Sequence, residues 1–231
     1  MSKKKRREIP RFQTPIIETH CHLDYLQEGE LEDTLAKSRD VGVEKIITIA
    51  VSPDNLDTVR ALANAGDYVW GTQGIHPHEA EAYSEQVEAR IRHSLNGDPR
   101  LLAVGEIGLD YYYDHADRET QRRVFEQQLQ IAVDLQLPVV IHTRDADEDT
   151  RAILANFSGM LPKGGVIHSF TSGMALAQYC LAEGFMLGFN GIATFNRADN
   201  VREVIAATPL DQALLETDAP VSYTHLRAHE T

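Results

Sequence analysis

Short apolar runs rich in β-branched residues alternate along this chain with longer amphipathic segments, and this alternation constrains the fold more than any other feature. Eight runs are expected to be strands, at residues 16–17, 45–49, 68–71, 101–105, 138–142, 165–168, 185–189 and 213–216. The segments between them are expected to be helices, at roughly 30–41, 53–65, 84–95, 117–136, 146–156, 173–183 and 199–206. Repeated strand–helix units imply a parallel sheet, and eight of them predict a closed (β/α)₈ TIM barrel. An open doubly wound sheet is the alternative, although no Gly-x-Gly-x-x-Gly follows the first strand.

The length of 231 residues fits one domain with a full hydrophobic core. We expect that domain to span residues 14–220, between a basic, disordered tail at 1–13 and a segment at 221–231 that does not belong to it. The first residues, Met1 to Arg7, are basic but lead into no apolar stretch, which predicts a solubilising tail and not a secretory signal. A nucleic-acid or nuclear-targeting patch is the alternative interpretation of that basic run.

Cysteine content and hydropathy indicate a compartment. The two cysteines, Cys21 and Cys180, are too few for a disulfide framework and suit a reducing environment. No apolar run approaches the roughly 20 residues that a membrane-spanning helix needs. We therefore expect a cytoplasmic protein with no membrane association and no obligate protein partner.

The net charge of −13 limits how this protein could act on nucleic acid. Affinity for phosphate usually rests on Lys and Arg, so an acidic surface repels nucleic acid by default. Any activity on nucleic acid must therefore use metal ions and a few well-placed cations.

Histidine and carboxylate residues fall where the predicted strands end. They are His20, His22, His76, His78, Glu106, His142, His168 and Asp218. All strand C-termini of a (β/α)₈ barrel lie at one face, so residues far apart in sequence converge there. Clusters of His and carboxylate are ordinary metal ligands, and the set predicts a metal site. Any one of these histidines alone would more simply be a satisfied core or loop residue.

The pair His20 and His22 brackets Cys21. Side chains i and i+2 of an extended segment share one face, so both imidazoles can reach one metal from the barrel interior. Cys21 then points between the barrel and its helices, as a small hydrophobic residue. Cys21 as a zinc ligand is the alternative.

Two carboxylates have the positions expected of catalytic groups. Glu106 can bridge two cations with its two oxygens, and Gly105 and Gly108 leave the backbone beside it free to turn. Asp218 ends the last strand and suits a metal ligand that also takes a proton from the attacking water. The alternatives are a cap or salt bridge for Glu106 and a simple turn before Pro220 for Asp218.

Arg144 follows His142 by two residues at the end of the fifth predicted strand. A guanidinium at the barrel rim can clamp a phosphate oxygen. The alternative is an ion pair with Asp145, Asp147 or Glu148.

Two further segments could contact a substrate. His76 and His78 could bind phosphate or donate a proton, whereas as metal ligands they would overfill the site. The run Tyr111 to Tyr113 could stack nucleobases, although a tyrosine cluster is more often packing.

Six segments together resemble the TatD family of metal-dependent deoxyribonucleases, within the wider amidohydrolase-like barrels. They are 18–24 (ETHCHLD), 74–78 (GIHPH), 104–111 (VGEIGLDY), 138–144 (PVVIHTR), 168–170 (HSF) and 215–220 (LETDAP). The resemblance runs from about residue 16 to 220, nearly the whole chain.

This resemblance implies a ligand set and an activity. It assigns metal binding to His20, His22, Glu106, His142, His168 and Asp218, with Glu106 bridging. It implies Mg²⁺-dependent, largely exonucleolytic cleavage of DNA phosphodiesters, and some relatives are linked to removal of D-amino acids from tRNA. Ligand type leaves the metal open, because His-rich sites favour Zn²⁺ or Mn²⁺ whereas Mg²⁺ prefers oxygen.

The sequence departs from the family pattern at two places. Glu18 stands where an Asp is frequent, and the residues after Pro220 do not resemble the family's closing segment. We therefore expect a truncated barrel whose eighth strand lacks a covering helix and exposes apolar surface.

The interpretation that follows is hydrolysis of single-stranded DNA by a water activated by two divalent metal ions, with Mg²⁺, Mn²⁺ and Zn²⁺ as candidates. His20 and His22 hold one ion with Asp218, while His142 and His168 hold the other. Arg144 and His76 bind the phosphate. Hydrolysis of another bond on the same barrel is one alternative, with a D-aminoacyl-tRNA ester or a small C–N or ester substrate. An inactive truncated product is the other.

Overall fold

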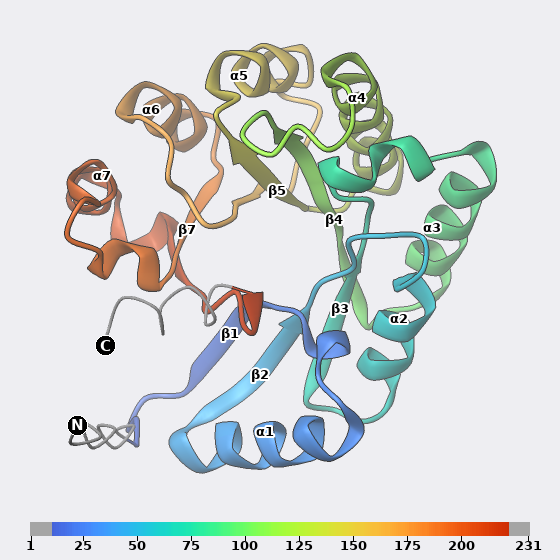
Figure 1. Ribbon diagram of the computed structural model, residues 1–231, viewed down its shortest axis with the longest axis vertical. Helices are drawn as coiled ribbons and strands as arrows, with labels where there is room; N and C mark the ends of the chain where they lie inside the picture. Colours follow the sequence, from blue (N-terminus) through green and yellow to red (C-terminus); the bar gives the residue numbers. More distant parts are fainter. Residues whose placement is uncertain (1–10, 222–231) are drawn as a thin grey trace.

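The computed structural model describes residues 11–221. Its eight parallel strands form one sheet, in which they follow one another in chain order (Figure 1). The strands are β1 (Ile16–Cys21), β2 (Val43–Thr48), β3 (Val69–Gln73), β4 (Leu101–Asp110), β5 (Val139–Arg144), β6 (Gly165–Ile167), β7 (Met186–Phe189) and β8 (Ala213–Leu215). The helices are α1 (Glu28–Val41), α2 (Leu56–Asn64), α3 (Glu85–Gly97), α4 (Arg118–Leu135), α5 (Asp147–Asn156), α6 (Met174–Ala182) and α7 (Asp199–Ala207). Short 3₁₀ turns lie at η1 (Leu23–Tyr25), η2 (Pro77–Ala82), η3 (Gly191–Thr194) and η4 (Leu210–Gln212). The helices alternate with the strands and pack around the outside of the sheet in an arc from α1 to α7, which confirms the predicted TIM barrel (Figure 1).

Local sequence signals explain several helix boundaries. The Asp117 side chain accepts a hydrogen bond from the backbone N–H of Thr120 at 3.0 Å and so caps the start of α4. Gly42 ends α1 with φ +100°, a left-handed conformation that glycine adopts without a steric penalty. These residue choices favour the observed helix ends through local interactions.

Two strands are longer than the apolar pattern predicted. β1 continues to Cys21, and β4 continues through Glu106 to Asp110. Hydrogen-bonded pairing with β5 extends β4, because a strand buried between two neighbours tolerates Gly and Glu residues that are weak strand formers alone. Gly108 is required at this contact, since a Cβ there would lie 2.0 Å from the carbonyl oxygen of His142. Glu106 therefore lies within a strand and not at its end.

The first and last strands come together mainly through the segment that follows β8. The backbone N–H of Asp218 donates to the carbonyl oxygen of His20 at 2.9 Å, and that of His22 donates to Ala219 at 2.7 Å. The Thr19 hydroxyl donates to the carbonyl oxygen of Leu215 at 2.9 Å. These contacts bring residues 19–22 and 215–219 side by side, about 200 positions apart in the chain.

The flank formed by β8 and β1 carries exposed apolar side chains. Within residues 11–221, no helix of the arc α1 to α7 covers this side, which lies between α7 and α1 (Figure 1). Leu215 is 73% exposed and Ile17 is 49% exposed. Whether the eighth strand lacks a covering helix stays a prediction, because residues 222–231 lie outside the described residues.

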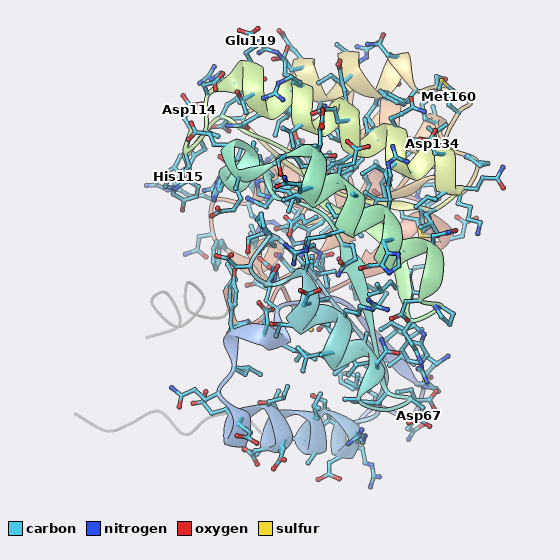
Figure 2. The ribbon with its side chains drawn as sticks, turned by 90° about the vertical axis from the view of Figure 1, so that its right-hand side faces the viewer. Asp67, Asp114, His115, Glu119, Asp134 and Met160 are labelled. Atoms are coloured by element: carbon cyan, nitrogen blue, oxygen red, sulfur yellow. The ribbon has the colours of Figure 1, made fainter. Side chains whose placement is uncertain are left out.

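The two ends of the barrel differ in content. Figure 2 shows Asp114 and His115, from the loop after β4, at one end, and Asp67, which precedes β3, at the other. The first end is the one where the strands terminate, so the predicted site residues gather there.

Within the described residues, no helix is both long and apolar enough to cross a bilayer.

Candidate metal centre

Most of the predicted site residues line one cavity of about 680 Å³ at the carboxyl end of the strands. Those residues are His22, His76, His78, Glu106, His142, Arg144, His168 and Asp218. His20 lies beneath them with only 1% of its surface exposed. The structure thus brings together the whole set that the strand-end pattern selected.

Glu106 lies at the centre of this set and is 2% exposed. Its Oε2 is 3.3 Å from Nε2 of His20, and its Oε1 is 3.1 Å from Nδ1 of His142. Burial raises the pKa of Glu106, but the charges of His168, His20 and His76 and a hydrogen bond from His142 outweigh it, so the pKa lies well below its usual range. An ionised carboxylate whose two oxygens face different imidazoles has the geometry of a bridging ligand.

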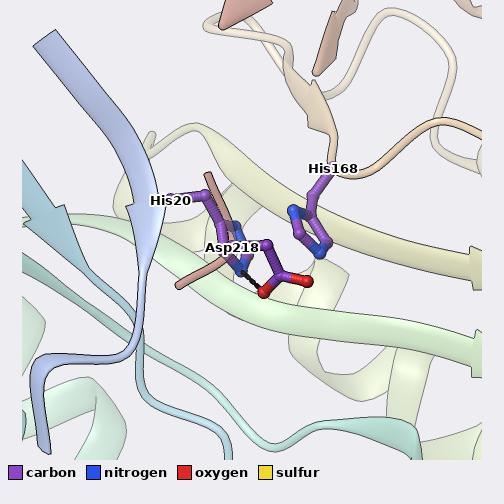
Figure 3. Close-up of side chains that lie close together, drawn as sticks. All are labelled: His20, His168 and Asp218. Carbon is purple, nitrogen blue, oxygen red and sulfur yellow. Dashed lines mark ion pairs between the residues drawn. The ribbon is translucent and has the colours of Figure 1, made fainter. Parts of the chain in front are cut away.

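Three groups of donor atoms are close enough together to hold a cation. They are His20, His22 and Glu106; His20, His168 and Asp218; and His76, Glu106 and His142. Figure 3 shows the second group, in which His20 of β1, His168 after β6 and Asp218 after β8 converge. Imidazole nitrogens with carboxylate oxygens suit Zn²⁺ and Mn²⁺ and leave Mg²⁺ possible.

Two buried histidines support occupancy by a metal. Nδ1 of His20 and Nδ1 of His22 have no hydrogen-bond partner among the described residues. Leaving a buried polar nitrogen unpaired costs free energy, and coordination of a cation removes that cost. The residues present therefore fit a divalent metal centre.

The grouping of His168 differs from our expectation. We expected His168 to share a cation with His142, but the structure groups its ring with His20 and Asp218. The rings of His20 and His168 are stacked with centroids 3.4 Å apart, whereas those of His142 and His168 are 6.4 Å apart. Which histidine shares which cation stays a prediction.

The sequence interpretation missed two buried carboxylates behind the histidine rings. Asp110 Oδ2 lies 3.0 Å from Nε2 of His142, and Glu216 Oε1 lies 2.9 Å from Nδ1 of His168. In each case the other ring nitrogen faces Glu106, at 3.1 Å for His142 and 3.8 Å for His168. A carboxylate that accepts the distal N–H sets the tautomer and orientation of a metal-binding imidazole.

A signal for both residues was present in the sequence. Asp110 is four positions after Glu106 on the same strand, and Glu216 is two positions before Asp218. Residues i, i+2 and i+4 of a strand share a face, so strand parity would have placed Asp110 with Glu106.

Burial lowers the pKa of His168, but the charges of Glu216 and Glu106 raise it to about 10.

His76 also lies closer to Glu106 than we expected, with Nε2 3.5 Å from Oε1. Its Nδ1 accepts the backbone N–H of His78 at 3.2 Å, so the neutral ring has its proton on Nε2. Burial lowers the pKa of His76 well below its ordinary value, which favours that neutral ring. A neutral Nε2–H suits donation to a phosphate oxygen, the role predicted for His76, although the distances also allow a ligand role.

Asp218 has φ +56°, in the left-handed region that residues other than glycine rarely adopt. Its Oδ1 lies 3.4 Å from Nε2 of His22 and 3.9 Å from Nε2 of His20. Such conformations cost roughly 1–3 kcal/mol and concentrate at functional sites. The backbone is thus held where the carboxylate faces both histidines of β1.

Cys21 points away from the donor groups, as the strand alternation predicted. It is 4% exposed and packs with Leu23, Ile46, Tyr68 and Val69. Its thiol donates to the carbonyl oxygen of Ile47 at 3.6 Å. The structure therefore gives no support to Cys21 as a zinc ligand.

Arg144 makes no ion pair within residues 11–221, so the alternative interpretation, an ion pair with nearby acids, is not observed. Its guanidinium instead lies over the rings of Tyr112 and Tyr113. Residues that the sequence interpretation did not select also line the cavity, among them Tyr25, Ile192 and Phe195. The Tyr25 ring stacks on that of His22, with centroids 5.3 Å apart.

A parallel barrel with imidazoles and carboxylates converging at its carboxyl end defines the class of barrel-type metal-dependent hydrolases. Comparison with known proteins gives the family. The model of the family described as TatD related DNase matches residues 17–230, and the chain belongs to this family.

Three relatives illustrate the similarity. The chain is 32% identical over 211 residues to an uncharacterized metal-dependent hydrolase, YabD, of Bacillus subtilis, covering 91% of this chain and 82% of that protein. It is 35% identical over 194 residues to the 3′-5′ ssDNA/RNA exonuclease TatD of Cronobacter turicensis, covering 84% and 73%. The crystal structure of the TatD homologue YjjV of Escherichia coli superposes with a TM-score of 0.83 at 35% identity, covering 89% of this chain and 79% of that one.

The predicted domain boundaries stay predictions. Residues 1–10, most of the predicted basic tail, lie outside the described residues, as do residues 222–231. The family match extends to residue 230, into the segment that we expected to lie outside the family pattern.

Proposed function

We propose that this protein is a deoxyribonuclease that hydrolyses phosphodiester bonds of single-stranded DNA from an end, with two divalent cations as cofactors. The observation that most supports this is the position of Glu106, whose two oxygens face His20 on one side and His142 on the other. A shared carboxylate between two donor groups is the arrangement that a two-cation phosphodiesterase needs. The name of the Cronobacter turicensis relative, a 3′-5′ ssDNA/RNA exonuclease, supports the substrate class and suggests the polarity.

The proposed ligands are His20, His22, Glu106, His142, His168 and Asp218, all but one of which line the cavity. Bound divalent cations would lower the pKa of a water and polarise the phosphoryl group. Asp110 and Glu216 hold the His142 and His168 rings so that one nitrogen of each faces Glu106.

Asp218 is the proposed general base. Its carboxylate faces the cavity beside His20 and His22 and can accept the proton of the attacking water. Glu106 is kept ionised by the surrounding imidazoles, so it offers negative charge and not a proton.

Arg144 and His76 are the proposed phosphate-binding residues. Arg144 is the only Lys or Arg among the described residues that line the cavity, which also contains Glu79, Asp110 and Asp145. In a protein with a net charge of −13, this one guanidinium and the Nε2–H of His76 supply the local donors for a phosphate oxygen.

The test is a nuclease assay on a short single-stranded DNA oligonucleotide with a 5′ label. It is run with Mg²⁺, Mn²⁺, Zn²⁺ or EDTA, and compared between wild type and the variants His20→Ala and Glu106→Gln. His93→Ala and Glu126→Gln are matched controls, because both side chains are exposed on helices, on α3 and α4. We expect a metal-dependent ladder that EDTA and both site variants abolish and both controls retain.

The alternative substrates are assayed in parallel with the same preparation. If protein with bound metal leaves DNA intact but cleaves an aminoacyl-tRNA ester or a small ester, the proposed substrate is wrong although the hydrolase class holds. If all substrates remain intact while the metal content is stoichiometric, hydrolysis by this chain is itself refuted.

A further inference from the structure

Exposed aromatic rings lie at the rim of the cavity beside His78. Tyr112 is 58% exposed and Tyr113 is 47% exposed, and both line the cavity. Both belong to the loop after β4, and Figure 2 shows His115 of the same loop at the carboxyl end of the barrel. The Tyr113 ring also lies parallel to that of His115, with centroids 5.8 Å apart, so the aromatic surface continues away from the metal ligands.

The positively charged side chain of Arg144 packs against these two rings. The guanidinium carbon of Arg144 is 4.1 Å from the ring centroid of Tyr112 and 4.8 Å from that of Tyr113. Because no carboxylate within residues 11–221 pairs with Arg144, its positive charge is not neutralised by a neighbour and remains available to an anion. The rim therefore presents a cation and π surfaces side by side.

The loop is fixed at both ends before any substrate binds. Asp110 Oδ1 accepts the backbone N–H groups of Tyr112 and Tyr113 at 3.0 and 2.8 Å. The Gln121 side chain, fully buried, donates to the carbonyl oxygens of Asp110 at 3.1 Å and Ala116 at 2.8 Å. A loop that is already ordered loses little conformational entropy when a ligand binds to it.

The Tyr112 and Tyr113 rings stand nearly perpendicular, with an interplanar angle of 89°. We propose that Tyr112, Tyr113 and Arg144 form a nucleobase-binding subsite, in which a base next to the scissile bond stacks on one of the two tyrosine rings and Arg144 contacts the adjoining phosphate. This proposal rests on the proposed nuclease function and names the part of the substrate that this rim recognises. Every base has a π face, so the subsite accepts all sequences. A base can reach the rings only when it is unpaired, so the subsite favours single-stranded ends over duplex.

The competing explanation is that the tyrosines only hold Arg144 in place. A base-containing oligonucleotide and one with abasic residues at its last two 3′ positions separate these explanations, because only the first can stack. Affinities are measured by fluorescence anisotropy in EDTA, where the proposed chemistry cannot proceed. Tyr112→Leu/Tyr113→Leu removes the rings, Tyr112→Phe/Tyr113→Phe keeps them, and thermal melting shows that each variant folds.

We expect the leucine variant to bind the base-containing strand about 5- to 150-fold more weakly, the range for loss of one stacked base. It should bind the abasic strand as wild type does, and the phenylalanine variant should keep wild-type affinity for both. Trp70→Leu is the matched control, since Trp70 lies beneath Arg100 at 4.7 Å but does not line the cavity. Equal weakening on both strands, or no weakening, would overturn the subsite.

A second readout uses 2-aminopurine at the 3′ end, whose fluorescence falls when the base stacks on an aromatic ring. Quenching by wild type and by the phenylalanine variant, but not by the leucine variant, supports the subsite. If quenching occurs and no metal supports hydrolysis, the proposed function fails while the subsite stands. If hydrolysis occurs and abasic and base-containing strands bind alike, the subsite fails while the function stands.

Discussion

Replacing Glu216 with glutamine should weaken metal binding although Glu216 is not a predicted ligand. Glu216 Oε1 lies 2.9 Å from Nδ1 of His168 and accepts the backbone N–H of Ser169 at 2.6 Å. The carboxylate therefore keeps the proton of His168 on Nδ1 and leaves Nε2 for a cation. Glutamine keeps the acceptor oxygen but removes the charge that makes the imidazole a stronger ligand.

The expected magnitude follows from this geometry. Loss of a carboxylate behind a metal-binding histidine lowers affinity about 10- to 100-fold, or roughly 1.4–2.7 kcal/mol. Because Glu216→Gln keeps an oxygen at both contacts, we expect about tenfold, and Glu216→Ala should approach a hundredfold. The space at this position is tight, since a Cβ on Gly188 would lie 2.4 Å from Glu216 Oε2, so the isosteric glutamine is the variant least prone to disturb packing.

The assay is calorimetric titration of the metal-free protein with Mn²⁺ and with Zn²⁺, alongside thermal melting. Asp110→Asn should show a similar loss through His142, which it contacts at 3.0 Å. Glu183→Gln is the matched control, because the Glu183 side chain is exposed and accepts a hydrogen bond from the exposed Ser158 hydroxyl at 2.5 Å. Unchanged affinities in folded Glu216→Gln and Asp110→Asn proteins would refute the reasoning that these carboxylates set the tautomers.

Three further predictions concern chemistry, pH and the open flank. Asp218→Asn should lower turnover on DNA about 10²- to 10⁴-fold, the range for loss of a general base, as measured by single-turnover kinetics with metal content determined in parallel. Asp98→Asn should destabilise the protein by about 1–2 kcal/mol at neutral pH in urea unfolding, because Asp98 is 7% exposed and pairs with Arg60 at 3.0 Å. Leu215→Thr should change stability by less than about 0.5 kcal/mol and reduce light scattering, because Leu215 is 73% exposed.

The effect of Asp98→Asn should depend on pH in one direction. Burial raises the pKa of Asp98, but hydrogen bonds from the Arg100 backbone, Asn64 and Arg60 outweigh it and place the pKa below its ordinary value of 3.8. A lowered carboxyl pKa contributes stability that is present above pH 3.8 and disappears as the pH falls through the lowered value. The difference between wild type and variant should therefore shrink in acid, and a difference that grows in acid would contradict this account.

Much of the fold could be predicted from local pattern. Alternation of apolar runs and amphipathic segments is a short-range property, and it identified each β-strand and each α-helix within residues 11–221, although not the 3₁₀ turns. The boundaries of β1 and β4 could not be predicted in this way, because pairing with neighbouring strands extends β4 to Asp110 despite its glycines. Strand ends moved where tertiary hydrogen bonds outweighed local propensity.

The sequence alone determined which residues meet, because a parallel barrel brings every strand terminus to one end whatever its exact register. That topology is sufficient to gather His20, Glu106, His142, His168 and Asp218 in one place. Only the tertiary structure decided how these ligands are divided among the donor groups and which ring nitrogen of His142 and of His168 faces Glu106. It also decided that Asp110 and Glu216 lie behind these two rings. These features depend on strand register and ring orientation to within an ångström. Both arise from packing between segments up to 200 positions apart, so local periodicity does not reveal them.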